Sequence, residues 1–489
     1  MVATLRLLLR NPLVSSILAV LVGVVAKLSL TNTELLPGLD GAYYWVQVRS
    51  LLEDHSLAFP DLPLVFWVQA GLAKIFGSVT LAVRLSDAIL PALSAIPIYL
   101  IGRKYKSPLL PAISILVVLL HPIQLYFFTG DFIKNEAAIP AVFFIALVLL
   151  NWDNQRKVIS LLYLAILFSI VVLSHFGTAL LALIFVGVWA ILQLRKIGGK
   201  IWIRGFAIFL VAISVVLYVF KILIPDRFER LLDFVTTPSI IIERPILDGM
   251  IHGYANSVIS FTIITNQVAC LILALVVWKN REQFSYSQRS LVVASLISTF
   301  ILSSPFISIE WANRLTGLSI VPLTVAAIMV FGCTGVYLNR IPVVILSLIV
   351  LLSSLFFIPM EKKYVFSNKK YADFKELVNQ VTIPNNSIIV ARHGVQYLTA
   401  WHFKTDVVLD NYFESSDLSS YAAVYLLVEK PGSDKKKEFA PPSDLSKDEK
   451  SSEKFPGGKP PSGGKELDPQ QLEGQRVFGN NSFTLVRIR

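Results

Sequence analysis

The chain has 489 residues, of which 54% are hydrophobic and only 16% are charged, and its mean hydropathy is +0.64. This composition is too apolar for a soluble globular protein and predicts a polytopic membrane protein. The formal net charge of +11 does not indicate nucleic-acid binding, because the lysines and arginines lie mostly in short loops between apolar segments. Cys270 and Cys333 both fall inside apolar segments, so neither is placed to form a disulfide in an extracytoplasmic domain.

The first apolar segment, from about Leu13 to Leu30, follows Arg6 and Arg10 and has some features of a signal peptide. Its length and the lack of a small-residue cleavage site predict an uncleaved first span instead. Residues 62–77 predict a short apolar helix that lies in the interface or re-enters the membrane. Ten further spans, which make eleven in all, are expected near residues 80–102, 108–128, 132–150, 158–174, 177–194, 202–224, 256–278, 290–306, 315–337 and 342–359.

The basic residues of the loops predict the orientation, because cytoplasmic loops are enriched in lysine and arginine. With eleven spans the basic clusters near residues 6–10, 103–106, 156–157, 195–204, 279–289 and 340 all fall on the side of the N-terminus. The N-terminus is therefore expected in the cytoplasm of a multi-pass protein of the cell (plasma) membrane. The loops 31–79 and 225–255 and everything after residue 360 are expected on the extracytoplasmic side.

The composition changes near residue 360, which predicts a membrane domain over 1–359 and a small extracytoplasmic α/β domain over 360–489. The expected elements of the second domain are a helix over 370–381, strands over 387–392 and 422–429, a helix between them over 394–403, and a C-terminal hairpin around a Gly-Asn-Asn turn. The segment from about 431 to 470 mixes charge, proline, glycine and serine without periodicity, so a disordered insertion is expected there.

Ionisable residues gather at the extracytoplasmic ends of the predicted spans, where charged groups are costly and often functional. They are Asp40, Arg84, Asp87, Asp131, Lys134, Glu136, His175, Glu310 and Arg314. The sequence predicts that they form a pocket of carboxylates and cations beneath the C-terminal domain.

Structural roles explain several of these residues equally well. Asp40 and Asp131 each precede a predicted helix and are candidates for its N-cap. Glu136 is a candidate for a protonated side chain that faces a neighbouring helix. Three- and four-residue spacing makes Arg84 with Asp87, and Glu310 with Arg314, candidate helix-surface ion pairs. His175 is more often structural than functional in such a position, and His121, followed by Pro122, is expected to be a packed or helix-bonded histidine.

Three segments carry a resemblance to a known superfamily. "GLDGAYYWVQVRSLLEDH" (38–55) resembles the first extracytoplasmic loop of GT-C glycosyltransferases, which has an acid soon after the first span. "FPDLPLVFWVQAGLAKIFGSVTLAVRLSDAI" (59–89) is similar to the following region of the aminoarabinose transferase and the protein O-mannosyltransferases. "TGDFIKNEAAI" (129–139) is similar to the second outer loop of the oligosaccharyltransferase catalytic subunit, where an acidic pair ending in Asn-Glu binds a divalent metal, with Lys134 standing in place of the first acid.

The resemblance implies a GT-C-like helical membrane protein and a role for each candidate residue. Asp40 would be the catalytic residue that deprotonates or orients the acceptor. Arg314, with Arg84 and Lys134 as alternates, would hold the phosphate of the donor. Asp131 and Glu136 would bind Mg²⁺ or Mn²⁺, with no organic cofactor. The family's WWDYG signature is absent, and "ARHGVQYLTAW" (391–401) at its place makes His393 and Tyr397 the expected acceptor-binding residues.

The implied activity is transfer of a sugar from a polyprenyl-phosphate-linked donor to a protein, lipid or glycan acceptor on the extracytoplasmic face. The expected partners are this donor, the lipid bilayer and the acceptor. A transporter or flippase of lipid-linked sugars is the main alternative, because charged residues in membrane proteins also mark transport pathways. A scaffold without activity, whose outer domain binds a partner, is the third possibility.

Overall fold

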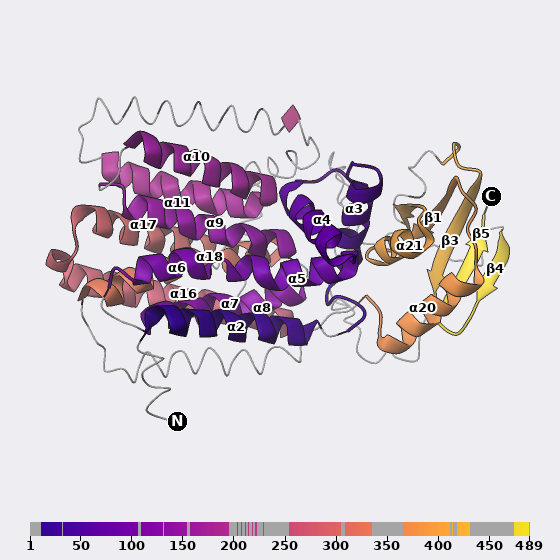
Figure 1. Ribbon diagram of the computed structural model, residues 1–489, viewed down its shortest axis with the longest axis horizontal. Coiled ribbons are helices and arrows are strands. Elements are labelled where there is room, and N and C mark those ends of the chain that lie inside the picture. The colour runs from indigo at the N-terminus through magenta and orange to yellow at the C-terminus, as the bar shows by residue number, and fades with distance from the viewer. Residues whose placement is uncertain are drawn as a thin grey trace, which may run out of the picture. The chain divides into compact units, whose positions relative to one another are not determined.

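The computed structural model describes residues 11–31, 33–105, 109–130, 132–153, 157–194, 254–304, 309–334, 365–410, 413, 418–430 and 474–488, with a few single positions between 203 and 228. Internal packing divides the chain into two compact units (Figure 1). The helical unit comprises Met1–Pro37 and Val48–Lys362. The α/β unit comprises Gly38–Gln47 and Lys363–Arg489, so it contains a short segment from near the N-terminus in addition to the C-terminal part of the chain.

The helical unit is built from long apolar helices and a few shorter ones (Figure 1). They are α2 (Pro12–Leu30), α4 (Leu64–Phe76), α5 (Val79–Ala92), α6 (Ala95–Gly102), α7 (Leu110–Leu120), α8 (Pro122–Thr129), α9 (Ile133–Leu150), α10 (Lys157–Ser174), α11 (Phe176–Leu194), α16 (Tyr254–Lys279), α17 (Tyr286–Leu302) and α18 (Ile309–Thr334). Helix α3 (Gly41–Glu53) starts in the α/β unit and ends in the helical unit.

Seven helices in the described ranges are long and apolar enough to cross a membrane, and the bent pair α7–α8 makes eight if it is one span. They correspond to the spans expected from residue 13 to residue 194 and to those near 256–278 and 315–337. The span expected over 290–306 matches α17, which has 17 residues. The segments 202–224 and 342–359 lie largely or wholly outside the described residues. The chain is thus a multi-pass membrane protein, and the total of eleven spans stays a prediction.

Short polar signals set where individual helices begin and end. The Asn11 side chain accepts a hydrogen bond from the Leu13 amide and Pro12 follows at the first helical position, which together start α2. Ser285 and Gln288 form a capping box at the start of α17. Gly77, in the left-handed conformation, ends α4.

The span expected over 108–128 is broken at His121, and its two halves, α7 and α8, differ in direction by 41°. Pro122 explains the break, because its ring displaces the backbone of the preceding residue from the helical region and it has no amide hydrogen to donate. His121 has ψ 141°, and its Nδ1 accepts a hydrogen bond from the Ile123 amide at 3.2 Å. This histidine is therefore buried and bonded to a helix start, as the sequence predicts.

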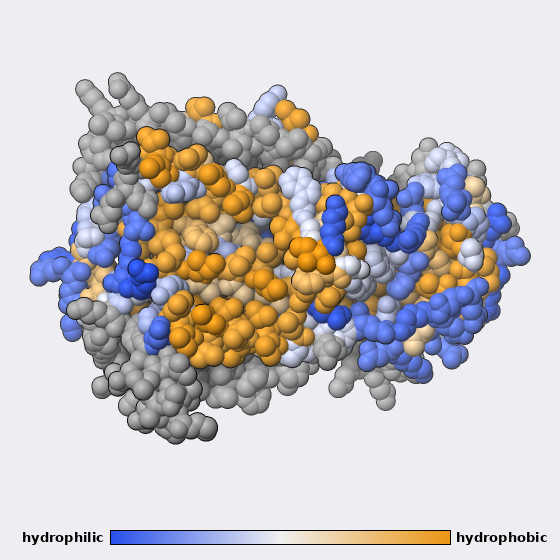
Figure 2. All heavy atoms as spheres, viewed as in Figure 1, coloured by the Kyte–Doolittle hydropathy of each residue, from blue (hydrophilic) through white to orange (hydrophobic). Residues whose placement is uncertain are grey.

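Helices α9 and α18 form the centre of the helical unit and bury most of their length, whereas α2 and α10 expose mostly apolar side chains. Figure 2 shows this broad hydrophobic surface over the helical unit. Such a surface is expected in a lipid bilayer, because burying an apolar side chain inside the protein provides no hydrophobic free energy when the surrounding lipid is equally apolar. Gly23 allows α2 to approach α7 closely, since a Cβ at this position would lie 2.5 Å from the Leu119 side chain.

The α/β unit contains a five-stranded sheet in the order β2-β1-β3-β5-β4. Strands β1 (Ser387–Ala391), β2 (Asp406–Leu409) and β3 (Ala423–Glu429) are parallel, and the hairpin β4 (Gln475–Gly479) and β5 (Phe483–Arg487) adds antiparallel strands beside β3. Helix α21 (Val395–Phe403) connects β1 to β2, and α20 (Asn368–Gln380) contacts β5. Every element predicted for this domain is present, and β2 was not predicted.

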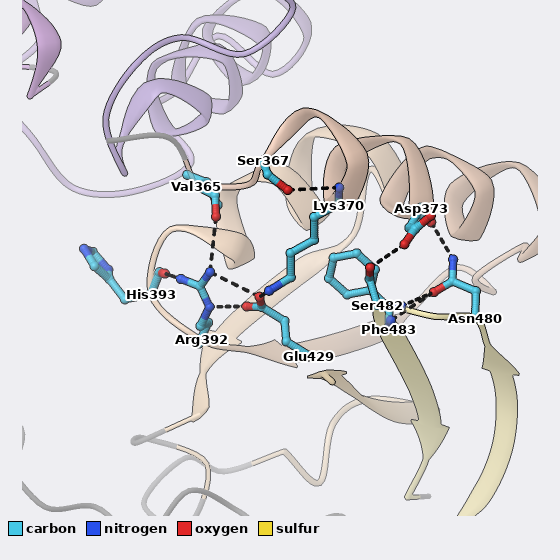
Figure 3. A network of polar contacts seen from close by, with 10 residues as sticks. All are labelled: Val365, Ser367, Lys370, Asp373, Arg392, His393, Glu429, Asn480, Ser482 and Phe483. Atoms are coloured by element: carbon cyan, nitrogen blue, oxygen red, sulfur yellow. Dashed lines mark hydrogen bonds and ion pairs between the residues drawn. The ribbon is translucent and has the colours of Figure 1, made fainter. Parts of the chain in front are cut away.

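Both faces of this sheet are packed. Val390, Val424 and Leu426 form an apolar cluster on one face with Ile388. On the α20 side, the rings of Phe366, Phe374 and Phe483 lie with their centroids 5.1–5.6 Å apart. The Asn480 side chain accepts hydrogen bonds from the Ser482 and Phe483 amides and so closes the predicted hairpin turn (Figure 3).

Replacing Phe483 by alanine is expected to destabilise the α/β unit by about 3–5 kcal/mol, because its side chain is fully buried between two other rings. Hydrogen exchange of the purified full-length protein measures this as faster exchange in β3 and β5. The matched control is Val477→Ala on the neighbouring strand, where the side chain is 43% exposed and a change within about 0.5 kcal/mol is expected. Equal exchange rates in the two variants would contradict this account of the core.

Candidate active site

Asp40 lies directly before α3, in the segment 38–47 that belongs to the α/β unit. Gly38, with φ 108°, has a backbone conformation that side chains disfavour, and it turns the chain just ahead of Asp40. The Asp40 carbonyl accepts a hydrogen bond from the Tyr43 amide at 2.9 Å and so begins the first turn. Asp40 therefore stands at a helix N-terminus, where a carboxylate is favoured by the helix dipole.

His393 lies opposite Asp40 in the same unit, with 3.7 Å between its Nε2 and Asp40 Oδ1. It comes from the loop between β1 and α21, which is shaped by Gly394 at φ +84°. A side chain on Gly394 would meet the Leu39 carbonyl oxygen at 3.1 Å, so the loop passes closely over the segment that carries Asp40. The Asp40 side chain is 48% exposed and that of His393 56%, although Asp40 Oδ1, the oxygen nearer His393 Nε2, is itself buried.

A network of charged side chains fixes the backbone beside His393 (Figure 3). Arg392 forms an ion pair with Glu429 at the end of β3 and donates hydrogen bonds to the carbonyls of His393 and Val365 at 3.1 and 3.3 Å. Lys370 from α20 pairs with the same glutamate. These bonds tie the loop after β1 to its neighbours and leave the imidazole of His393 pointing away from the network.

Aromatic rings extend the Asp40–His393 pair into a larger surface. Tyr397 lies 6.2 Å from His393 and 5.1 Å from Tyr43, measured between ring centroids. Trp45 and Trp401 pack 5.7 Å apart along the same two helices, α3 and α21. Two segments that are far apart in the sequence, 40–45 and 393–401, therefore pack together. We refer to Asp40, Tyr43, His393 and Tyr397 as the Asp40 site.

The Asp40 site lies at the carboxyl ends of strands β1 and β3. The chain leaves β1 toward β2 on one side, whereas it leaves β3 toward β5 and β4 on the other. The carboxyl ends of β1 and β3 thus flank a topological switch point, which is where open α/β sheets commonly bind their ligands. His393 follows β1 and Glu429 ends β3, so the site lies at this edge.

The helical unit contains a second cluster of ionisable groups, which is buried. Lys27 Nζ in the last turn of α2 lies 2.7 Å from Glu136 Oε1 in the first turn of α9, and the two side chains are 0% and 1% exposed. Asp87 of α5 is equally buried and interacts electrostatically with both. Lys27 also lies 4.8 Å from the centroid of the Phe128 ring. We call Lys27, Asp87 and Glu136 the buried charge cluster.

Two of the predicted phosphate-binding cations have partners within the helical unit. The Arg84 guanidinium donates a hydrogen bond to the Thr33 carbonyl and so ties the chain after α2 to α5. Lys134 forms an ion pair with Asp61 in the loop before α4 and lies 5.7 Å from the centroid of the Phe66 ring. Arg84 is thus not paired with Asp87 in the way the three-residue spacing suggests.

The remaining predicted residues are only partly described. Arg314 is an exposed residue of α18. His175 Nδ1 accepts a hydrogen bond from the Thr178 amide at 3.3 Å at the start of α11, which is a structural role. Asp131 and the side chain of Glu310 lie outside the described residues, so their predicted roles stay predictions. No group of three or more His, Cys, Asp or Glu side chains that suits a metal occurs among the residues described.

The sequence analysis missed Lys27 and Asp61 as members of the charged clusters. Lys27 had a readable signal, because it is the only charged residue within the first span and a lysine in a membrane helix requires a partner. Asp61 lies between two prolines in a loop and gave no comparable signal.

Comparison with known proteins agrees with the fold. A family model described as dolichyl-phosphate-mannose-protein mannosyltransferase matches residues 54–219. The archaeal oligosaccharyltransferase AglB of Archaeoglobus fulgidus, in complex with an inhibitory peptide and a dolichol-phosphate, aligns with a TM-score of 0.52 at 12% identity over 84% of this chain and 69% of its own. An oligosaccharyltransferase of Archaeoglobus fulgidus in complex with Zn and sulfate aligns with a TM-score of 0.51 at 13% identity, over 83% of this chain and 67% of its own.

ArnT of Cupriavidus metallidurans in the apo state covers 97% of both chains at 11% identity, with a TM-score of 0.46. None of the curated proteins compared matches the sequence. The chain therefore shares the GT-C fold of these oligosaccharyltransferase structures. Its segment 54–219, about a third of the chain, is also similar to the mannosyltransferase family.

Replacing Gly394 by alanine is expected to loosen the Asp40 site, because the substitution places a side chain at φ +84° and against the Leu39 carbonyl. A cost of about 1–3 kcal/mol follows from such a backbone conformation. Hydrogen exchange of the full-length protein is expected to rise in residues 38–47 and 391–401. Gly71→Ala in α4, where a Cβ meets nothing within 4 Å, is the matched control and leaves both segments unchanged. Unchanged exchange in the Gly394 variant would refute the close approach.

Proposed function

We propose that the protein is a membrane glycosyltransferase that moves a sugar from a polyprenyl-phosphate-linked donor to a nucleophilic acceptor on the extracytoplasmic side of the plasma membrane. The observation that carries the proposal is the meeting of Asp40 with His393 at an exposed site, in a chain with the GT-C fold. The solved oligosaccharyltransferase of that fold was obtained with a dolichol-phosphate, which supports a lipid-phosphate donor for this chain.

The proposed reaction needs a base on the acceptor side. The Asp40 carboxylate takes the proton of the acceptor hydroxyl or amide as the acceptor heteroatom attacks the anomeric carbon. The bond between that carbon and the phosphate oxygen breaks, and the polyprenyl phosphate leaves with the electron pair. A positioned carboxylate contributes by accepting the proton in the transition state.

The phosphate side needs cations, because negative charge grows on the leaving oxygen. Arg314 is the preferred candidate, as the resemblance implies, since an arginine binds phosphate through two parallel hydrogen bonds. Arg84, which donates to the Thr33 carbonyl, and Lys134, which pairs with Asp61, are the alternates.

The acceptor is proposed to lie on the aromatic part of the Asp40 site. Tyr43 and Tyr397 offer ring faces and hydroxyl groups, and the imidazole of His393 offers a donor or acceptor beside the attacking atom. Aromatic side chains with polar tips suit ligands that are partly apolar and partly hydrogen-bonding, as sugars and peptides are.

Asp40→Asn is expected to lower the rate of sugar transfer by about 10²–10⁴-fold, because the amide keeps the shape of the side chain and loses the base. The measurement is glycosidic product formed by purified protein in liposomes that contain a polyprenyl-phosphate sugar. Asp54→Asn, at the other end of α3, is the matched control and keeps full activity. Unaltered transfer by Asp40→Asn would rule out the proposed role, and movement of the donor across the bilayer without product would favour a flippase.

His393→Ala is expected to raise KM for the acceptor by roughly 2- to 12-fold with a smaller change in kcat, which is the effect of one lost hydrogen bond of about 0.5–1.5 kcal/mol. Tyr421→Phe is the control, because the hydroxyl of Tyr421 bonds to Asp406 at the start of β2, at the opposite edge of the sheet. An effect of His393→Ala on the KM of the donor alone would contradict an acceptor role.

A further inference from the structure

The buried charge cluster bears on the metal expected from the resemblance. Of the two acids predicted to bind a divalent cation, Glu136 is the one whose side chain the structure describes. Its Oε1 accepts the ammonium of Lys27 at 2.7 Å, and both groups are inaccessible to solvent. Mg²⁺ and Mn²⁺ bind carboxylate oxygens at about 2.0–2.2 Å. A divalent ion on Glu136 would therefore share one carboxylate with an ammonium and be repelled by it.

Lys27 supplies one positive charge for the two carboxyl groups of the cluster. Its ammonium forms the ion pair with Glu136, and Asp87, which is also buried, interacts electrostatically with both. A buried charge persists only when an opposite charge compensates it, and Lys27 provides this for Glu136. The Phe128 ring contributes a further favourable contact with the ammonium.

Asp87 and Glu136 each retain one oxygen that makes no hydrogen bond within the protein, Oδ1 and Oε2. These buried oxygens are the groups that would ligate a cation if the ammonium were absent. Removing Lys27 would leave two buried carboxyl groups from different helices, α5 and α9, without the ammonium that pairs with Glu136. Buried carboxylates without a counter-charge attract a hard cation, which prefers oxygen ligands.

We propose that Lys27 is the covalently attached counter-ion of Glu136, beside Asp87, and that this cluster does not hold the divalent metal that the resemblance implies. Glu136 is then a structural residue and does not bind metal. The proposal does not depend on Asp40 or on the nature of the acceptor, so its failure would leave the proposed transfer reaction untouched.

The proposal is tested by the thermal stability of the purified full-length protein with Mn²⁺ or with EDTA. The wild type is expected to melt at the same temperature in both, or to show a Mn²⁺ effect that survives in Glu136→Gln. Lys27→Ala is expected to melt lower than the wild type in EDTA and to gain about 2–4 °C in Mn²⁺. The gain should disappear in the double variant with Glu136→Gln.

Lys74→Ala, which removes an exposed lysine from the last turn of α4, is the matched control and acquires no Mn²⁺ response. A Mn²⁺-dependent rise in the wild type that Glu136→Gln abolishes would overturn the proposal. A folded Lys27→Ala variant without any response to Mn²⁺ would overturn it as well. If Lys27→Ala does not fold, electron paramagnetic resonance compares Mn²⁺ binding by the wild type and by Glu136→Gln. Equal binding supports the proposal, and binding that is lost in Glu136→Gln overturns it.

Discussion

The buried ion pair between Lys27 and Glu136 constrains how the helices of the helical unit pack. It joins the last turn of α2 to the first turn of α9, and Asp87 brings α5 into the same cluster. Removing one partner of such a buried pair typically costs about 3–5 kcal/mol, because the other charge is left without compensation. The cluster therefore fixes the positions of α2, α5 and α9 along one another. Because α9 is mostly buried, the helices that pack against it are positioned by the same cluster.

In the α/β unit, ion pairs between half-buried and exposed side chains fix the loop that carries His393. Glu429 receives Arg392 from the end of β1 and Lys370 from α20, so one carboxylate positions the loop that carries His393. The same unit includes residues 38–47, and the proposed base and the proposed acceptor-binding residues thus belong to one compact body. Their mutual geometry is set by packing within this unit, which explains why Gly38 and Gly394 are needed where the backbone turns.

Elements with a strong local signal were predictable from the sequence. The apolar segments gave the long helices, and the β-branched runs over 387–391 and 423–429 gave β1 and β3. Strand β2 was missed because it has only four residues, which is too short for a clear alternation of apolar and polar side chains. The sequence predicted one continuous span over 108–128 and not two helices that meet at His121. The segment is apolar throughout, and Pro122 is the only signal of the break within it. For the Asp40 site, the sequence singled out Asp40, His393 and Tyr397 separately and did not single out Tyr43. Lys27 of the buried charge cluster was also missed.

The sequence by itself determined that the chain is a membrane protein with a C-terminal α/β domain, because hydropathy, periodicity and turn residues act over a few neighbouring residues. Only the tertiary structure decided which ionisable groups meet. It paired Glu136 with Lys27, Lys134 with Asp61 and Asp40 with His393. The physical reason is that a buried or partly buried charge is stable only beside a compensating group. These compensating groups lie on helices and loops far apart along the chain, so tertiary packing decides which of them are close enough to pair.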